Sequence, residues 1–99
     1  MDAPLSSKQV RKLKALAQRL DATLRIGRQG LSDAFLQSLI RAFDHQELVK
    51  VRFDEFKEQR KTLAPALAAR SGSHLVTLIG HVAVLYRPHP DPARRRVLV

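Results

Sequence analysis

Two glycines three positions apart enclose an arginine and a glutamine in the segment Gly27-Arg28-Gln29-Gly30. Glycine lets the backbone turn sharply and approach a ligand without interference from a Cβ atom. The segment lies between a predicted strand and the start of a predicted helix, whose unpaired N–H groups and partial positive charge would face it. Backbone amides could therefore hold a phosphate group there, with Arg28 and the neighbouring Arg25 adding charge-assisted hydrogen bonds.

Four residues of this kind also suit a plain turn between a strand and a helix. The dinucleotide-binding fingerprint requires a third glycine and an acidic residue about 20 positions further on, so the segment does not predict a nucleotide cofactor. Comparable glycine-pair loops hold the sugar-phosphate backbone in KH domains. The loop therefore indicates either a structural turn or a contact with the phosphates of a nucleic acid.

A cationic helix precedes this loop in the sequence. Ser6 and Gln9 fit a capping box, and the apolar residues that follow have helical spacing: Val10, Leu13, Leu16, Ala17 and Leu20. The opposite face carries basic residues with no acidic residue among them: Lys8, Arg11, Lys12, Lys14 and Arg19. A helix that is merely solvated tends to mix both signs of charge. We therefore expect this face to contact a polyanion, and a phosphate strand to rest where the helix and the loop meet.

A second predicted strand, residues 48–53, could extend the basic surface. Val49, Val51 and Phe53 alternate along it with Lys50 and Arg52, so the two basic side chains would project from one face. A strand lysine can also simply protect a sheet edge from pairing with another chain. For Lys50 both interpretations stay open.

The composition is that of a small globular domain with a strong basic excess. Of 99 residues, 44% are hydrophobic and 27% charged, which favours one folded domain. The net charge of +9 favours a polyanionic partner, either nucleic acid or an anionic membrane surface. The absence of cysteine excludes disulfides and thiolate chemistry. No apolar run is long enough to span a membrane or to serve as a signal sequence, so we expect a cytoplasmic protein without a membrane anchor.

Catalytic and metal-binding patterns are missing from the sequence. The four histidines lack metal-ligand spacing: His45, His74, His81 and His89. No Ser-His-acid set and no carboxylate pair is brought together by the spacing of the residues. We therefore expect no enzyme activity, no metal, no cofactor and no small-molecule substrate.

The few aromatic residues are expected in the interior. All four phenylalanines fall on predicted apolar faces: Phe35, Phe43, Phe53 and Phe56. The predicted sheet therefore lacks the exposed aromatic platform with which RNA-recognition-motif proteins stack bases. Binding of RNA would then depend on backbone and shape more than on sequence.

The periodicities predict an α/β domain of order α-β-α-β-α-β-β. The expected elements are a helix from Ser6 to Leu20, a strand over 23–26, a helix over 32–43, a strand over 48–53, a helix within 54–70 and strands over 74–79 and 82–87. Pro65 conflicts with the third helix, which should begin near Thr62 or kink at Pro65. Gly72 suits its left-handed cap, and Gly80 permits a hairpin. Helical connections favour a four-stranded mixed sheet with largely parallel pairing.

Four segments of the chain together resemble the CRM domain, named for chloroplast RNA splicing and ribosome maturation, whose bacterial stand-alone members are called YhbY-like. These segments are Leu5-Ser6-Ser7-Lys8-Gln9, Ile26-Gly27-Arg28-Gln29-Gly30-Leu31, Glu47-Leu48-Val49-Lys50-Val51 and Ile79-Gly80-His81-Val82-Ala83-Val84-Leu85-Tyr86-Arg87-Pro88. The resemblance spans residues 5 to 88 in matching order and implies a fold similar to the C-terminal domain of translation initiation factor 3. We therefore expect a domain over 1–88 and a mobile Pro/Arg-rich tail over 89–99.

The resemblance also implies a function. CRM domains are RNA-binding modules, and their bacterial members associate with precursors of the large ribosomal subunit. Ribosomal RNA or such a precursor particle is thus the expected partner. From the family, only the Gly27–Gly30 loop and the basic surface of the first helix carry over. Together with the strand cations that the charge pattern adds, they give the expected RNA-binding residues: Lys8, Arg11, Lys12, Arg19, Arg25, Gly27, Arg28, Gln29, Gly30, Lys50 and Arg52. Two departures are His81, where a basic residue is commoner, and Pro65. A translation-factor-like binder of the small subunit and a basic protein-interaction module are the alternatives.

Overall fold

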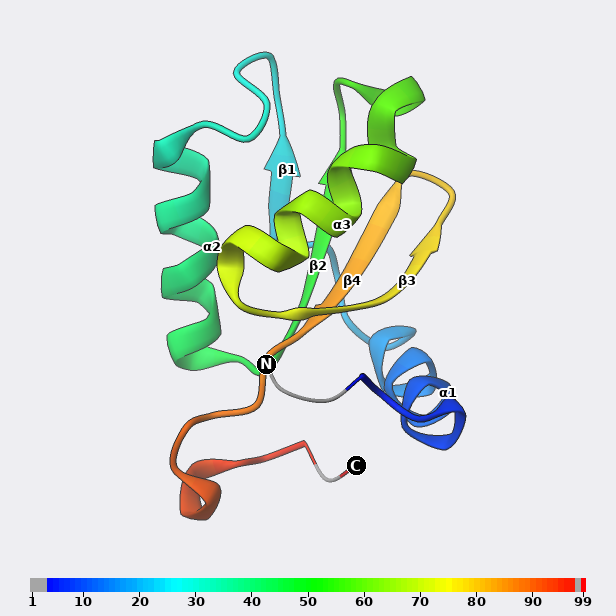
Figure 1. Cartoon of the computed structure of the whole chain (residues 1–99), viewed down its shortest axis with the longest axis vertical. Helices are drawn as coiled ribbons and strands as arrows, with labels where there is room; N and C mark the ends of the chain where they lie inside the picture. The colour runs from blue at the N-terminus through cyan, green and yellow to red at the C-terminus, as the bar shows by residue number, and fades with distance from the viewer. Residues whose placement is uncertain (1–3, 98) are drawn as a thin grey trace.

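Four strands form one mixed sheet in the order β1-β2-β4-β3. The computed structural model describes residues 4–97 and 99. Its strands are β1 (Leu24–Ile26), β2 (Leu48–Phe53), β3 (His74–Ile79) and β4 (Val82–Tyr86). Its helices are α1 (Ser7–Ala17), α2 (Asp33–His45) and α3 (Arg60–Ser71), with the short 3₁₀ helices η1 (Lys57–Gln59) and η2 (Pro92–Arg94). The predicted order of elements and the four-stranded mixed sheet are confirmed (Figure 1).

The pairing of the strands is mostly antiparallel. β1 and β2 are parallel, whereas β4 pairs antiparallel with both β2 and β3. The expectation of largely parallel pairing is therefore wrong. The reason is that the chain passes from β2 through α3 to the far edge, so that β3 skips one position and the hairpin returns β4 into the gap beside β2.

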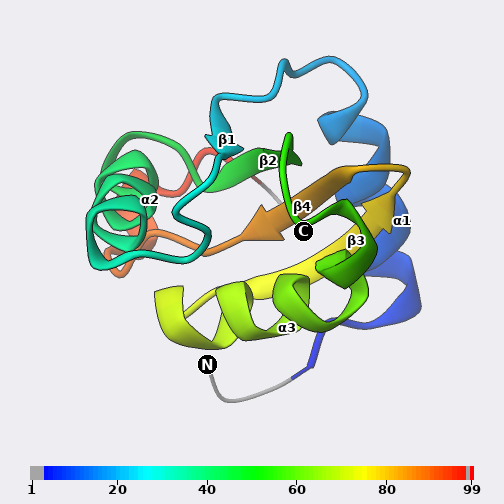
Figure 2. The ribbon, with the colours of Figure 1, turned by 90° about the horizontal axis from the view of Figure 1, so that it is seen from above.

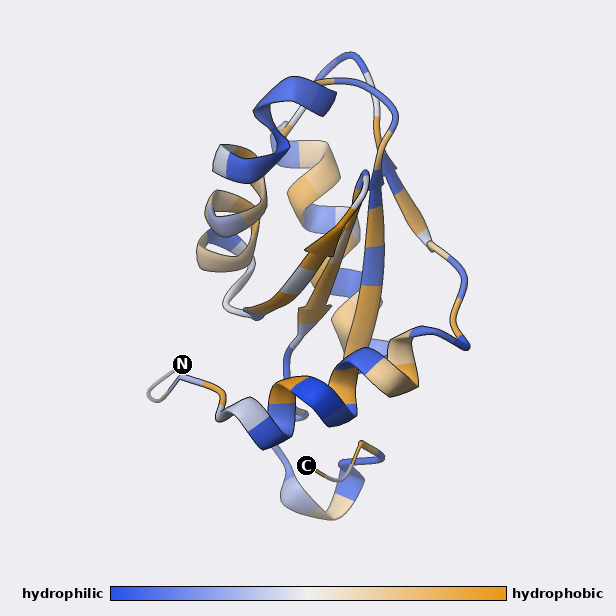
Figure 3. Ribbon diagram, turned by 90° about the vertical axis from the view of Figure 1, so that its right-hand side faces the viewer, coloured by the Kyte–Doolittle hydropathy of each residue, from blue (hydrophilic) through white to orange (hydrophobic). Residues whose placement is uncertain are grey.

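The helices cover the two faces of the sheet unequally. Helices α2 and α3 lie on one face, and α1 crosses part of the other (Figure 2). Alternation along β2 explains this division: Val49, Val51 and Phe53 belong to the larger core under α2 and α3, while Leu48 joins Leu13 of α1 in a smaller core. In Figure 3 the strands are largely hydrophobic, and hydrophobic and hydrophilic residues alternate along α1.

Helix α1 begins as predicted but ends early. Ser6 Oγ accepts from the Gln9 amide at 3.1 Å, and Gln9 Oε1 accepts from the Ser6 amide at 2.9 Å, which is the expected capping box. The helix stops at Ala17. Leu20 therefore lies beyond the helix and is 39% exposed, while Leu16, although within the helix, is 38% exposed, so neither completes the apolar stripe.

Helix α3 runs through its proline. It begins at Arg60, two residues before the expected start near Thr62, and Pro65 is its sixth residue. Pro65 is exposed, so its ring points away from the core, although it has no N–H to donate within the helix. Gly72 ends the helix at φ 68, as its position predicts. Within residues 4–97 and 99, no helix is long and apolar enough to cross a membrane.

Candidate functional site

The Gly27–Gly30 loop is an exposed turn at the end of β1. The Gly30 amide donates to the Gly27 carbonyl at 3.0 Å, which closes the turn and leaves Arg28 and Gln29 exposed at its corner. Gly30 has a φ of 61° in the left-handed region, whereas a Cβ atom at Gly27 would meet nothing within 4 Å. The backbone conformation therefore favours glycine at position 30, whereas position 27 borders open space.

The segment after β2 packs against this loop. The amides of Asp54 and Glu55 both donate to the Ile26 carbonyl, at 3.1 and 3.0 Å, and the ring of Phe56 lies against Gly30. Phe56 itself is left-handed, with a φ of 57°, and is 40% exposed. The expectation that Phe56 belongs to the core is wrong, because helical structure begins only after this residue, at Lys57.

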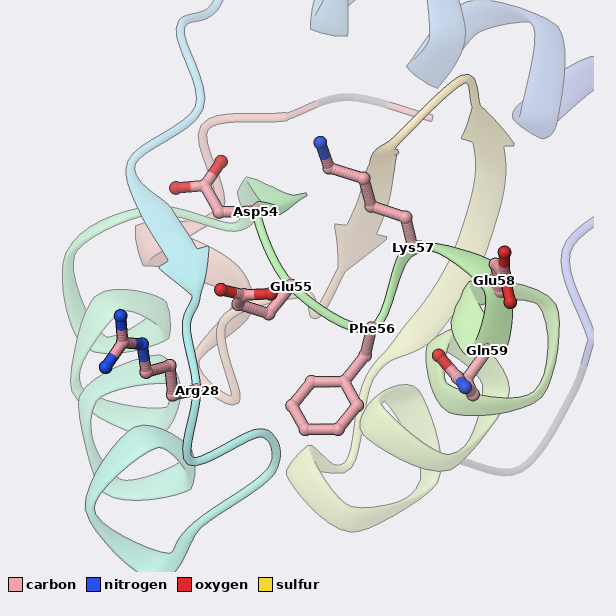
Figure 4. A pocket seen from close by; sticks show the side chains of 7 residues that line it. All are labelled: Arg28, Asp54, Glu55, Phe56, Lys57, Glu58 and Gln59. Carbon is pink, nitrogen blue, oxygen red and sulfur yellow. The ribbon is translucent and has the colours of Figure 1, made fainter.

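A cavity of about 470 Å³ lies between Arg28 and this segment. Arg28 lines one side and residues 54–59 the other, with the Phe56 ring between them (Figure 4). Three carboxylates, those of Asp54, Glu55 and Glu58, share the lining with Arg28 and Lys57. The surroundings of the loop are therefore mixed in charge rather than uniformly basic.

Arg25 and Arg52 lie side by side on neighbouring strands. They are register partners in the parallel β1–β2 pair, and both reach Asp54: Arg25 Nη1 at 3.5 Å from Oδ2 and Arg52 Nε at 3.4 Å from Oδ1. The two arginine side chains are more than half exposed. Ion pairs of this kind stabilise a fold only weakly, so both guanidinium groups are accessible to a stronger anion.

The basic helix and the glycine loop do not meet. In Figure 1 the loop, in cyan, lies at one end of the sheet, and α1, in blue, lies at the other. Helix α1 packs on β2, β3 and β4, and the chain then runs along β1 before it reaches Gly27. The expected adjacency is therefore wrong. The cations of α1 are exposed as predicted: Lys8, Arg11, Lys12, Lys14 and Arg19.

Lys50 closes the carboxyl end of α1. Its Nζ atom donates to the carbonyl oxygens of Ala17 and Leu20, at 3.1 and 2.8 Å. A cation favours this end of a helix, where carbonyls lack partners. Because β2 is an interior strand, the interpretation of Lys50 as protection of a sheet edge does not apply. The sequence carries no signal that connects two positions about thirty residues apart.

Glu47 holds the C-terminal tail, a role that no local sequence pattern indicates. Its side chain is 7% exposed and accepts hydrogen bonds from the backbone amides of His89 and Val97, each at 2.9 Å, and from that of Arg96. Burial alone would raise the pKa of Glu47, but these hydrogen bonds and the charge of Arg95 outweigh it and lower that pKa. The described tail therefore packs against the domain, contrary to the mobility predicted for it.

Metal-binding geometry is not found among the described residues. No three histidine, aspartate or glutamate side chains of residues 4–97 and 99 gather closely enough to hold a metal ion. The glycine loop, the arginine pair on the sheet and the cationic surface of α1 are each exposed to solvent. All of them suit an anion.

Comparisons with known proteins agree with these features. The profile of a family described as the CRS1 / YhbY (CRM) domain matches residues 5–87, close to the 5–88 over which the sequence shows its resemblance. A Haemophilus influenzae protein named "RNA-binding protein" is 35% identical over 88 residues, covering 88% of this chain and 89% of that protein. A Pseudomonas aeruginosa protein named "Probable RNA-binding protein" is 34% identical over 89 residues, covering 89% and 86%.

A solved structure shares the fold. The solution structure of a Staphylococcus aureus protein superposes with a TM-score of 0.77 at 29% identity, covering 95% of this chain and 99% of that one. The similarity therefore extends over nearly the whole chain.

Proposed function

Because this chain belongs to the CRS1 / YhbY (CRM) domain family, we propose that it is a non-catalytic RNA-binding protein that acts on ribosomal RNA of large-subunit precursors during ribosome maturation. The observation that carries this proposal is the exposed Gly27–Gly30 turn, which lies within the family match and presents Arg28 beside an unobstructed Gly27. The names of the two bacterial relatives support the RNA as ligand.

Each part of the surface has a distinct role in this proposal. At Gly27 a phosphate approaches the backbone closely because no side chain intervenes, and Arg28 supplies charge. Arg25 and Arg52 give up their weak ion pairs with Asp54 and bind phosphates of the RNA backbone instead. The RNA then continues along the face of the sheet that α1 crosses, towards the cations of that helix: Lys8, Arg11, Lys12 and Arg19. One strand would thus connect the loop and the helix although they are apart.

The decisive variant is Gly27→Glu. It places bulk and negative charge where the phosphate would lie, in open space, so the fold should be unaffected. We expect affinity for a large-subunit precursor RNA fragment, measured by fluorescence anisotropy, to fall at least tenfold, about 1.4 kcal/mol. Ala69→Glu is the matched control, because it adds the same charge to an exposed position of α3. Equal RNA affinities of the two variants would show that the Gly27–Gly30 loop does not bind the RNA.

The helix surface is tested by salt. Replacing Lys8, Lys12 and Arg19 by glutamine removes three phosphate contacts. The slope of log affinity against log salt should then decrease by about 2, since each contact on a single strand contributes about 0.7. An unchanged slope would show that α1 does not contact the RNA.

Sedimentation identifies the particle. The protein should co-sediment with precursors of the large subunit in a sucrose gradient of a cell lysate. Co-sedimentation with the small subunit would instead support a translation-factor-like role. Partners that survive nuclease treatment would support a protein-interaction module.

A further inference from the structure

A groove of about 1110 Å³ separates α1 from the C-terminal tail. One wall is the side of α1 that carries Lys12, Leu16 and Arg19, and the other wall is the tail over residues 93–97. The end of α2 and the start of β2, residues 43–48, form its base. In Figure 1 α1 and the tail lie at the end of the sheet opposite the Gly27–Gly30 loop, so the groove that they line belongs to that end.

The tail wall is built by specific contacts. Glu47 accepts hydrogen bonds from the backbone amides of residues 89, 96 and 97. Asp91 Oδ1 accepts a hydrogen bond from the Ala93 amide at 3.0 Å and so caps η2. Val97 packs on the smaller core. The family match ends at Arg87, so this wall lies outside the part of the chain that the family profile matches. The tail thus presents its arginines from a fixed backbone.

The charge of the groove is strongly one-sided. Five basic side chains line it: Lys12, Arg19, Arg94, Arg95 and Arg96. The lining contains two acidic residues. Glu47 is buried and accepts hydrogen bonds from backbone amides, so Asp44 is the one exposed carboxylate among the described lining residues. Within the part of the chain that the structure describes, no salt bridge joins any of the five. This excess of accessible cations is complementary to a phosphate backbone.

The apolar part of the lining favours unpaired bases. Leu16 and Leu20 are each more than a third exposed at the groove, and apolar surface of this kind can cover base faces that only a single strand presents. Arginine guanidinium groups bind phosphates in two-point contacts and also stack on bases. A peptide made only of acidic residues would satisfy the charge but would leave this apolar surface without a matching partner.

We propose that the groove between α1 and the tail is a second RNA-binding site, which takes a single-stranded segment with its phosphates on Arg94 and Arg96. This inference rests on the proposed function and adds to it a ligand for a part of the chain outside the family match. The RNA would then be held at both ends of the domain, through its backbone at Gly27–Gly30 and through a flexible, unpaired segment at the groove.

The test is the double variant Arg94→Gln/Arg96→Gln in the full chain. It keeps the backbone amide of residue 96 that docks the tail on Glu47. The probe is a fluorescein-labelled 12-nucleotide oligouridylate. We expect its affinity to fall about tenfold and the salt slope to decrease by about 1.4, for two lost phosphate contacts. The matched control is Arg41→Gln/Lys61→Gln, which removes the same charge from exposed positions of α2 and α3.

The outcomes separate this inference from the proposed function. If the double variant binds the oligouridylate as tightly as the control does, the proposal that the groove binds RNA is wrong. The same conclusion follows if the wild-type protein binds the precursor RNA fragment but not the oligouridylate, and in both cases the Gly27→Glu result still decides the proposed function. Competition by polyglutamate as effective as that by oligouridylate would assign the groove to an acidic peptide and overturn its assignment to RNA.

Discussion

Gly30 lies directly against the ring of Phe56, so that a Cβ atom at position 30 would approach Cε2 of the ring to 3.3 Å. Its φ of 61° also belongs to the left-handed region that side chains disfavour. Gly27 has neither constraint. The two glycines of the loop are equivalent in the sequence pattern but not in the molecule: Gly30 serves the fold, and Gly27 borders open space.

Stability measurements should separate the two positions. We expect Gly30→Ala to lower the free energy of unfolding by about 1–2 kcal/mol, because of the left-handed backbone and the crowded ring. Gly27→Ala should change it by less than about 0.5 kcal/mol. Urea denaturation of both variants gives the comparison, and equal losses would contradict the division of roles.

Lys50→Met tests the link between β2 and α1. The variant keeps the aliphatic stem but removes the side-chain donor to the Leu20 carbonyl and one of the two donors to the Ala17 carbonyl, which still accepts from the Leu20 amide at 3.1 Å. We expect the free energy of unfolding to fall by about 1–2 kcal/mol and hydrogen exchange to speed up in the last turn of α1.

Arg52→Met is the control for that change. It lies on the same face of β2, but its guanidinium pairs with Asp54 at the surface, so the loss should stay below about 1 kcal/mol. A larger loss from Arg52→Met than from Lys50→Met would show that Lys50 does not hold the helix.

Leu13 and Leu16 offer a comparison within one helix. Leu13 is fully buried in the smaller core, whereas Leu16 is 38% exposed. Leu13→Ala should cost about 2–4 kcal/mol of unfolding free energy through the cavity that it leaves. Leu16→Ala should cost less than about 1 kcal/mol. Thermal denaturation of the two variants checks the difference, and similar costs would mean that α1 packs on the sheet by another face.

Local and periodic patterns are sufficient for most of the fold. The Ser6–Gln9 capping box and the alternation in β2 depend on residues at most a few positions apart, and the structure confirms them. The same holds for Gly80, whose φ of 57° turns the hairpin between β3 and β4. Such features depend on backbone geometry that a short segment settles by itself.

Features that depend on distant segments were not predictable in this way. The periodicity predicted that Phe56 lies in a helix and in the core. In the structure its backbone is left-handed and its ring contacts Gly30, which belongs to a different part of the chain. Lys50 looked like a surface cation, and its two acceptors belong to the end of α1. Helix α1 and the glycine loop are likewise close in the sequence, but β1 runs between them and places them at opposite ends of the sheet. Charge and glycine pattern named the candidate groups, but not which of them share a surface.

The docking of the tail should depend on pH through Glu47. Its pKa is lowered in the folded protein, since hydrogen bonds from three backbone amides outweigh the effect of burial. A lowered carboxyl pKa means that the charged form stabilises docking at any pH above its ordinary value near 4.5. This stabilisation should decrease as the pH falls from there through the lowered pKa, while the domain itself remains folded.

The measurement is amide exchange and chemical shift at Val97, whose amide donates to Glu47 at 2.9 Å. Glu47→Gln should weaken docking by about 1–3 kcal/mol at neutral pH, because a neutral amide replaces a carboxylate acceptor, and should abolish the acid dependence. Glu58→Gln, an exposed carboxylate near Gly27–Gly30, should leave Val97 unchanged. If Val97 remained equally protected in Glu47→Gln, another contact would hold the tail. The presentation of Arg94 and Arg96 at the groove would then not depend on Glu47.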